Sequence, residues 1–161
     1  MTLNFGFSIG ISRSILICAS LALTTPALAT GGFDCSIDDA KLSLETSAAL
    51  GTSLGSPILN LQAVAKTKIK GTPVDMAEIN LKDSLVHSWM THPDLDLHFY
   101  WEREGDKPHA TFNLVIKTKD MGDEISSDGK YELEIFYTEP PADKVEGAYL
   151  KAKGKVHCEV E

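Results

Sequence analysis

Long apolar segments are scarce in this sequence of 161 residues. A transmembrane helix needs about 20 consecutive apolar residues, and the apolar stretch from Ile15 to Leu23 is roughly half as long. We therefore expect no membrane partner and no membrane anchor once the N-terminal segment has been removed. The chain also lacks internal repeats, low-complexity tracts and a coiled-coil pattern, so we expect an ordinary folded domain.

Acidic residues are missing from the first 30 positions, where Arg13 is the one basic residue. This basic residue, the apolar stretch after it and the ending Ala27-Leu28-Ala29 form the layout of a secretory signal peptide. We therefore predict a cleaved signal peptide at residues 1–29 and a single β-domain at residues 30–161. The mature protein is expected to be exported, to the periplasm or outside the cell.

Cys18 raises the alternative of a lipoprotein signal, which ends in an acylated cysteine. Ile17 precedes it where a small residue is required, and the better cleavage site lies downstream. Cleavage after Ala29 is therefore the prediction.

Cysteine is rare, since the mature chain has Cys35 near its start and Cys158 near its end. There is no C-x-x-C motif, which disfavours a redox or metal thiolate pair. Disulfides form and persist in exported proteins, so an even pair predicts a bridge. A bridge across a loop this long stabilises by up to about 4–5 kcal/mol in the chain-entropy model.

Basic residues are fewer than acidic ones. The whole chain has 15 Lys and Arg against 23 Asp and Glu. Loss of Arg13 with the signal takes the net charge from −8 to −9. Nucleic acids and anionic membranes reward clustered positive charge, so we expect neither as a partner.

Alternation of apolar and polar residues with a period of two is the dominant pattern after residue 30. Such alternation predicts strands with one buried and one solvated face, the mark of antiparallel sheets. Turn-forming Gly, Pro, Asp and Ser residues separate the runs. The seven or eight expected strands are 33–37, 42–45, 59–66, 79–89, 95–102, 111–117, 131–137 and 148–160.

Two segments do not alternate. Residues 47–54 are small and polar, which predicts a loop or one helical turn, and the acidic residues 120–128 predict a loop. With so little helix, the apolar faces of the strands can only meet each other. The prediction is an all-β antiparallel β-sandwich, because the strands are uneven in length, with a closed or partly open β-barrel as the alternative.

The pairing of the terminal strands follows from the cysteines. Cys35 and Cys158 occupy apolar-face positions of the first and last strands, and a disulfide needs Cα atoms about 5.5 Å apart. These strands should therefore be neighbours. We also expect 131–137 and 148–160 to form a hairpin. That pairing sets a row of two glutamates opposite a row of three lysines: Glu132 and Glu134, then Lys151, Lys153 and Lys155.

The segment with the most metal-binding residue types begins at His92. In an extended strand Asp94, Asp96 and His98 point to one face, away from the apolar residues between them. Imidazole with carboxylate suits Zn²⁺ or Cu²⁺. Residues along one strand diverge, however, and a solvated strand face is the alternative. We expect no resident cofactor, with Zn or Cu as the minority hypothesis.

Two aromatic residues, Tyr100 and Phe136, fall on the otherwise polar faces of their strands. Exposed together on a sheet, they would make an aromatic binding face for a sugar or a protein partner. The alternative is that a loop such as 120–128 covers them.

The sequence matches G-x-S-x-G at residues 51–55 and S-x-x-K at residues 127–130, but a chain with so little expected helix does not supply the strand-to-helix turn of a nucleophile elbow, so nucleophilic catalysis is not predicted. The sequence therefore favours a small exported non-catalytic domain that binds a protein or a glycan. One alternative is a periplasmic metal-binding protein that uses the histidine-containing strand. A second is a small hydrolase whose carboxylates are dispersed in the sequence, because paired carboxylates need not be close along the chain.

Overall fold

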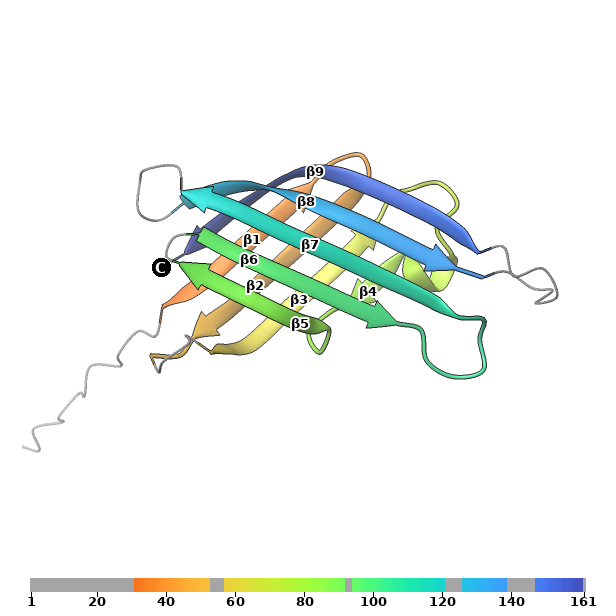
Figure 1. Cartoon of the computed structure of the whole chain (residues 1–161), viewed down its shortest axis with the longest axis horizontal. Coiled ribbons are helices and arrows are strands. Elements are labelled where there is room, and N and C mark those ends of the chain that lie inside the picture. Colours follow the sequence, from red (N-terminus) through yellow and green to blue (C-terminus); the bar gives the residue numbers. More distant parts are fainter. Residues whose placement is uncertain (1–30, 53–56, 92–93, 121–125, 139–146, 161) are drawn as a thin grey trace, which may run out of the picture.

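The computed structural model describes residues 31–52, 57–91, 94–120, 126–138 and 147–160. Over these residues the chain forms nine strands and one short 3-10 helix (Figure 1). The predicted signal peptide, His92 and much of the predicted loop 120–128 lie outside the described residues. The elements are β1 (Gly32–Asp38), β2 (Leu42–Leu50), β3 (Ile58–Thr67), η1 (Val74–Met76), β4 (Glu78–Asn80), β5 (Leu85–Thr91), β6 (Asp94–Glu102), β7 (Ala110–Asp120), β8 (Ser126–Tyr137) and β9 (Ala148–Val160).

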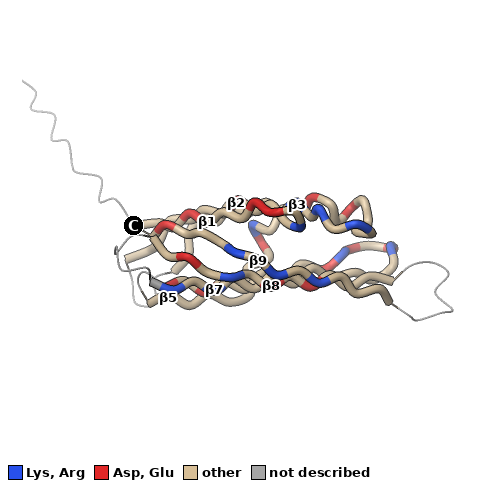
Figure 2. The backbone as a smooth tube through the Cα atoms, turned by 90° about the horizontal axis from the view of Figure 1, so that it is seen from above, with Lys and Arg blue, Asp and Glu red and all other residues tan. Residues whose placement is uncertain are grey.

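All nine described strands belong to a single antiparallel sheet, in the order β4-β3-β2-β1-β9-β8-β7-β6-β5. The sheet curls into two facing layers, with β1, β2 and β3 opposite β5, β7 and β8 (Figure 2). β4 and β5 are the two edge strands of the sheet, although they are consecutive in the sequence and only residues 81–84 connect them. The fold is therefore an all-β, partly open barrel flattened into two layers, which confirms the predicted fold class.

The period-two alternation places the core between the layers. On β6, Leu95, Leu97 and Phe99 are at most 1% exposed, while the residues between them face outward. Leu114 and Leu133 continue the same inner face on β7 and β8. Burial of each such side chain contributes about 1.5–3 kcal/mol, so this inner face is the main source of stability.

Three predicted segments differ in detail from the structure. In the predicted loop 120–128, the described residues 120 and 126–128 instead belong to β7 and β8. The run 79–89 is split into β4 and β5, because Asn80 Oδ1 accepts a hydrogen bond from the Lys82 N–H and starts a turn. Residues 47–50, predicted as loop or helical turn, instead continue β2, since Gly32 of β1 pairs with Ala49. These changes raise the described strand count to nine, against the seven or eight predicted.

β1 and β9 are neighbours, as the cysteines predict. Cys35 lies directly opposite Cys158, with the two sulfurs 2.02 Å apart and the Cα atoms 4.1 Å apart. The pairing of these two strands covers only Phe33–Ser36 and His157–Val160. Beyond it, β1 pairs with β2 alone and β9 with β8 alone, so the two strands part. We call the paired region the disulfide end.

The predicted hairpin is also present. β8 and β9 pair antiparallel along their whole length, with Glu134 opposite Lys151 and Glu132 opposite Lys153. Both pairs are ion pairs, and Lys153 Nζ lies 2.7 Å from Glu132 Oε1. The third lysine departs from the prediction, because Lys155 faces Lys130.

Where β1 and β9 have parted, the two layers touch through Tyr131. Its ring lies across Gly154 of β9, where a Cβ atom would come within 2.4 Å of the ring. Its hydroxyl donates a hydrogen bond of 2.6 Å to Asp39 Oδ2 in the β1–β2 turn. Gly154 is therefore required by close packing, and it lets a residue of β8 reach the opposite layer.

Candidate functional site

A groove of about 1070 Å³ lies on the outer face of the sheet, over β7, β8, β9 and the end of β1. It occurs where β1 turns away from β9 after Ser36. Its floor includes the half-buried side chain of Val115 and the buried positions Ile37 and Val156. Charged side chains from four strands stand around this apolar floor: Asp38, Lys117, Lys119, Asp128, Lys130, Glu132, Lys155 and His157.

Three of these lysines form one row across three strands. Lys117 of β7 is directly opposite Lys130 of β8, and Lys130 is directly opposite Lys155 of β9. Lys119 stands one outward position further along β7. Figure 2 shows basic residues on β7, β8 and β9 side by side. Like charges directly opposite each other destabilise a sheet, so this row costs folding free energy.

Gly129 allows β7 and β8 to lie close together beside the row of lysines. A Cβ atom at this position would lie 2.1 Å from the carbonyl oxygen of Lys117, so β7 and β8 could not stay at their present separation. A larger residue would push apart the strands that carry Lys117 and Lys130.

The acidic residues of the groove are each bound to a base. Asp38 Oδ1 is 2.7 Å from Lys68 Nζ, and Asp128 Oδ1 is 2.8 Å from His157 Nδ1. Glu132 is held by Lys153. All three carboxylates therefore have basic partners that are not among the groove lysines.

These lysines have no such partners in the described part of the chain. Within the described residues, no ion pair of 4 Å or less joins Lys117, Lys119, Lys130 or Lys155 to an acid. Lys117 helps to lower the pKa of Glu132, and Lys119 lies opposite Asp128 in the pairing of β7 with β8. We call Lys117, Lys130 and Lys155 the lysine row; it is an excess of positive charge on a protein that is acidic as a whole.

Two pKa shifts describe the electrostatics around the row. The hydrogen bond and charge of Lys153, aided by Lys117 and Lys151, hold the pKa of Glu132 below its ordinary value. The hydrogen bond to Asp128 raises the pKa of His157 above 6.5, against a smaller opposing effect of burial. Glu132 is therefore ionised at neutral pH, and His157 keeps its proton to a higher pH than a free histidine.

The predicted metal-binding strand is placed on the same outer face, on β6. Asp94, Asp96 and His98 do share a face, and His98 Nε2 is 2.6 Å from Asn113 Oδ1. In the described part of the chain, no group of three His, Cys, Asp or Glu side chains is arranged to hold a metal ion. His92 lies outside that part, so the metal hypothesis stays a prediction without geometric support from the described residues.

The two predicted aromatic residues share the outer face but are not neighbours. Tyr100 is on β6 and Phe136 is on β8, with β7 between them, and their register positions differ by two residues. Phe136 instead contacts Tyr149 and His109, with ring centroids 4.8 and 5.7 Å apart. The expectation of a joined Tyr100–Phe136 surface was therefore wrong in its pairing, because sequence parity gives the face of a residue and not its strand neighbours.

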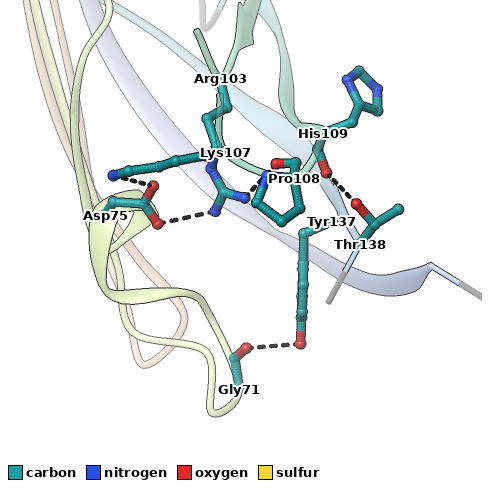
Figure 3. Close-up of polar contacts among 8 residues, drawn as sticks. All are labelled: Gly71, Asp75, Arg103, Lys107, Pro108, His109, Tyr137 and Thr138. Atoms are coloured by element: carbon teal, nitrogen blue, oxygen red, sulfur yellow. Dashed lines mark hydrogen bonds and ion pairs between the residues drawn. The ribbon is translucent and has the colours of Figure 1, made fainter. Parts of the chain in front are cut away.

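Figure 3 shows a second polar cluster, which lies toward the other end of the long axis from the disulfide end (Figure 1). The Arg103 guanidinium donates to Asp75 Oδ1 at 2.9 Å and to the Pro108 carbonyl at 2.6 Å. Tyr137 donates to the Gly71 carbonyl at 2.9 Å. These contacts join residues 71–75, before β4, to β8 and the β6–β7 hairpin, so they tie one layer to the other. We call this cluster the polar end.

The sequence analysis missed the lysine row. Its members were visible as outward-facing positions of three predicted strands, 111–117, 131–137 and 148–160, or just beyond them. The missing information was register, because a shift of two residues would set Lys130 opposite Lys153 or another residue. Lys130 does interrupt the acidic outer row of β8, between Asp128 and Glu132, and that signal could have been noticed.

We found no family model, curated protein or solved structure that matches this chain. The described residues contain no helix long and apolar enough to cross a membrane.

Proposed function

We propose that the mature chain is an exported, non-catalytic domain that binds a protein or glycan partner in the groove over β7, β8, β9 and β1. Export follows from the predicted signal peptide at residues 1–29, and the cysteine pair at bonding distance is compatible with an oxidising location. The groove is the observation that carries the proposal.

Its size and lining support a binding role. Small-molecule sites occupy roughly 300–1,000 Å³ and combine an apolar floor with a few polar groups that orient the ligand. Here the floor around Val115 is ringed by lysines, and the volume is about 1070 Å³. The outward face of the fold thus has a concave region that could hold a chain end or several sugar units.

A binding role is favoured over hydrolysis by the state of the groove carboxylates. A glycosidase needs one carboxylic acid with a raised pKa beside a second, ionised carboxylate. In the groove the pKa of Glu132 is lowered, and Asp38 and Asp128 are each engaged by a base. These three acids are therefore suited to holding lysine and histidine side chains in place.

A binding role in the groove is also favoured over one at the aromatic residues. Tyr100 is 40% exposed and Tyr149 is 66% exposed, but they lie on β6 and β9, with two strands between them. Single exposed aromatics are ordinary on protein surfaces. The groove instead brings residues of four strands around one concavity.

The test is a two-dimensional amide NMR titration of the mature, oxidised protein with a panel of neutral and acidic oligosaccharides and peptides. The proposal expects shift changes at groove amides such as Ser36, Val115, Gly129 and Val156, saturating in the millimolar range or below. Changes confined to β5 and β6, or no changes with any member of the panel, would reject it.

A blocking variant sharpens the assignment. Val115→Arg puts a long side chain on the groove floor and should abolish the shift changes. The matched control is Val86→Arg, which alters a side chain that is 57% exposed on β5 and outside the groove. Equal loss of binding in both variants would speak against the groove.

A further inference from the structure

The lysine row is an energetic anomaly within its own hairpin. On one side of it, the next two outward rows of β8 and β9 have glutamate opposite lysine, Glu132 with Lys153 and Glu134 with Lys151. On the other side, Asp128 faces His157. Between these rows the pattern breaks, and Lys130 takes the place in β8 where a third acid would complete the ladder. Lys117 then extends the repulsion to β7.

We propose that the lysine row is the recognition element of the groove and that its ligand is a sugar bearing several phosphate or sulfate groups. This inference rests on the proposed function, because it names the ligand chemistry of the same groove. A row of unpaired like charges that weakens the sheet is explained if a polyanion neutralises it on binding.

The number and type of basic residues favour several anionic groups over one. Lysine acts as a compact point charge on a flexible stem, whereas arginine forms a planar fork suited to one carboxylate. No arginine lines the groove within the described residues. Three lysines in line, with Lys119 beside them, therefore suit a ligand whose charges are spread over several groups.

The spacing favours a sugar over an acidic peptide. Adjacent strands are about 4.8 Å apart, so the row presents a new ammonium stem at each such step. In an extended peptide, side chains on one face recur only about every 6.7 Å. Phosphate or sulfate groups on neighbouring carbons of a sugar ring match the closer spacing better, and the ring can pack on the apolar floor at Val115 and the lysine stems.

Titration calorimetry at near-physiological salt tests the proposal with four probes: sucrose octasulfate, tripolyphosphate, a penta-glutamate peptide and sucrose. The octasulfate should bind most tightly, tripolyphosphate more weakly and sucrose not measurably. Binding of penta-glutamate at least as tight as that of the octasulfate would overturn the sugar assignment in favour of an acidic protein partner.

Paired variants with an equal loss of charge separate a built site from general charge attraction. Lys130→Gln with Lys155→Gln should weaken octasulfate binding by about tenfold or more, because two charge-assisted contacts are lost. Lys66→Gln with Lys82→Gln removes the same charge from two exposed lysines that have partners outside the groove. This control should change binding by about twofold or less, and equal losses in the two double variants would overturn the proposal.

Lys130→Glu gives a readout that a purely structural role would not produce. It places an acid between Lys117 and Lys155, so the melting temperature should rise while octasulfate binding falls at least as far as in the glutamine variant. A lower melting temperature together with unchanged binding would overturn the inference.

The outcomes also separate this inference from the proposed function. If neutral oligosaccharides shift the groove amides and the octasulfate does not bind, the groove binds a ligand but the row does not select it. If no probe and no panel member binds, both proposals fail.

Discussion

The two ends of the flattened barrel are closed by different chemistry. At the disulfide end, β1 and β9 are joined by backbone pairing and by Cys35–Cys158. At the polar end, the layers are held by side chains, chiefly Arg103 with Asp75 and Tyr137 with the Gly71 carbonyl (Figure 3). These regions lie toward opposite ends of the long axis (Figure 1).

The difference lies in how each closure stabilises the fold. A disulfide acts mainly by restricting the unfolded chain, so its contribution depends on loop length and little on pH or salt. Polar contacts act in the folded state alone, and their strength depends on burial and charge. The groove lies between the two, where β1 and β9 have parted. The disulfide end therefore holds the paired residues of β1 and β9 together while the two strands part farther along β9.

The largest expected effect on stability comes from removing the bridge at the disulfide end. Cys35→Ala with Cys158→Ala should lower the free energy of unfolding by up to about 4–5 kcal/mol, because the bridge joins cysteines with a sequence separation of 123. Thermal denaturation of the variant and of the oxidised and reduced wild type measures it. Labelling of two thiols in the native, unreduced protein would contradict the bridge itself.

Breaking the polar end should cost less. Arg103→Met removes hydrogen bonds to the Asp75 carboxylate and to the Pro108 carbonyl from a side chain that is 8% exposed, a loss of about 1.5–3 kcal/mol. Lys107→Met is the matched control, since Lys107 also contacts Asp75 but is 64% exposed, and should cost less than about 1 kcal/mol. Chemical denaturation compares the two, and equal losses would show that burial at Arg103 does not matter.

A third variant tests the tie between the layers at Tyr131. Tyr131→Phe removes the hydrogen bond to Asp39 and should cost about 0.5–1.5 kcal/mol at neutral pH. Tyr149→Phe, at an exposed hydroxyl, is the control and should have almost no effect.

The same variant has a defined pH dependence. Burial opposes ionisation of Asp39, but hydrogen bonds from the Tyr131 hydroxyl and from the Lys41 and Leu42 N–H groups hold the pKa of Asp39 below 3.8. The stability from this ionised group is present above pH 3.8 and is lost as the pH falls through the lowered pKa. The gap between wild type and Tyr131→Phe should therefore narrow in acid, and a gap that widens below pH 3.8 would contradict this assignment.

The smallest effect on stability is expected from the glutamate–lysine pairs of β8 and β9. Glu134→Gln removes an exposed ion pair with Lys151 and should lower the stability only slightly at low salt, and less at high salt. Denaturation at two salt concentrations measures it. A loss as large as that of Arg103→Met would mean that exposed cross-strand pairs close this fold as strongly as the polar end does.

Much of the fold could be predicted because its signals are local. Alternation on β6, with Leu95 and Leu97 inward and Asp96 outward, needs only the strand itself to be read. Segment 79–89 could not be divided in advance, because the turn at Asn80 depends on a side-chain hydrogen bond. Residues 47–50 join β2 because β1 and β3 are beside them, and their own composition gives no such indication.

The candidate site was less predictable than the fold. The interpretation of Lys151 and Lys153 as partners of glutamates was correct, since a hairpin joins consecutive strands and its register is restricted. The same reasoning assigned Lys155 to that ladder, yet this residue faces Lys130. Lys117 was not considered at all, because it belongs to a strand that is separated from β9 by β8.

By itself, the sequence determined the strand character of the chain, the inward faces of its strands and the meeting of its first and last strands at the cysteines. Side-chain parity and loop closure are properties of the chain that need no knowledge of distant neighbours. Only the tertiary structure decided the register across β7, β8 and β9, the parting of β1 from β9 and the groove between them. A groove and a row of opposed charges exist only between strands, and each added strand brings a register that its own residues do not specify.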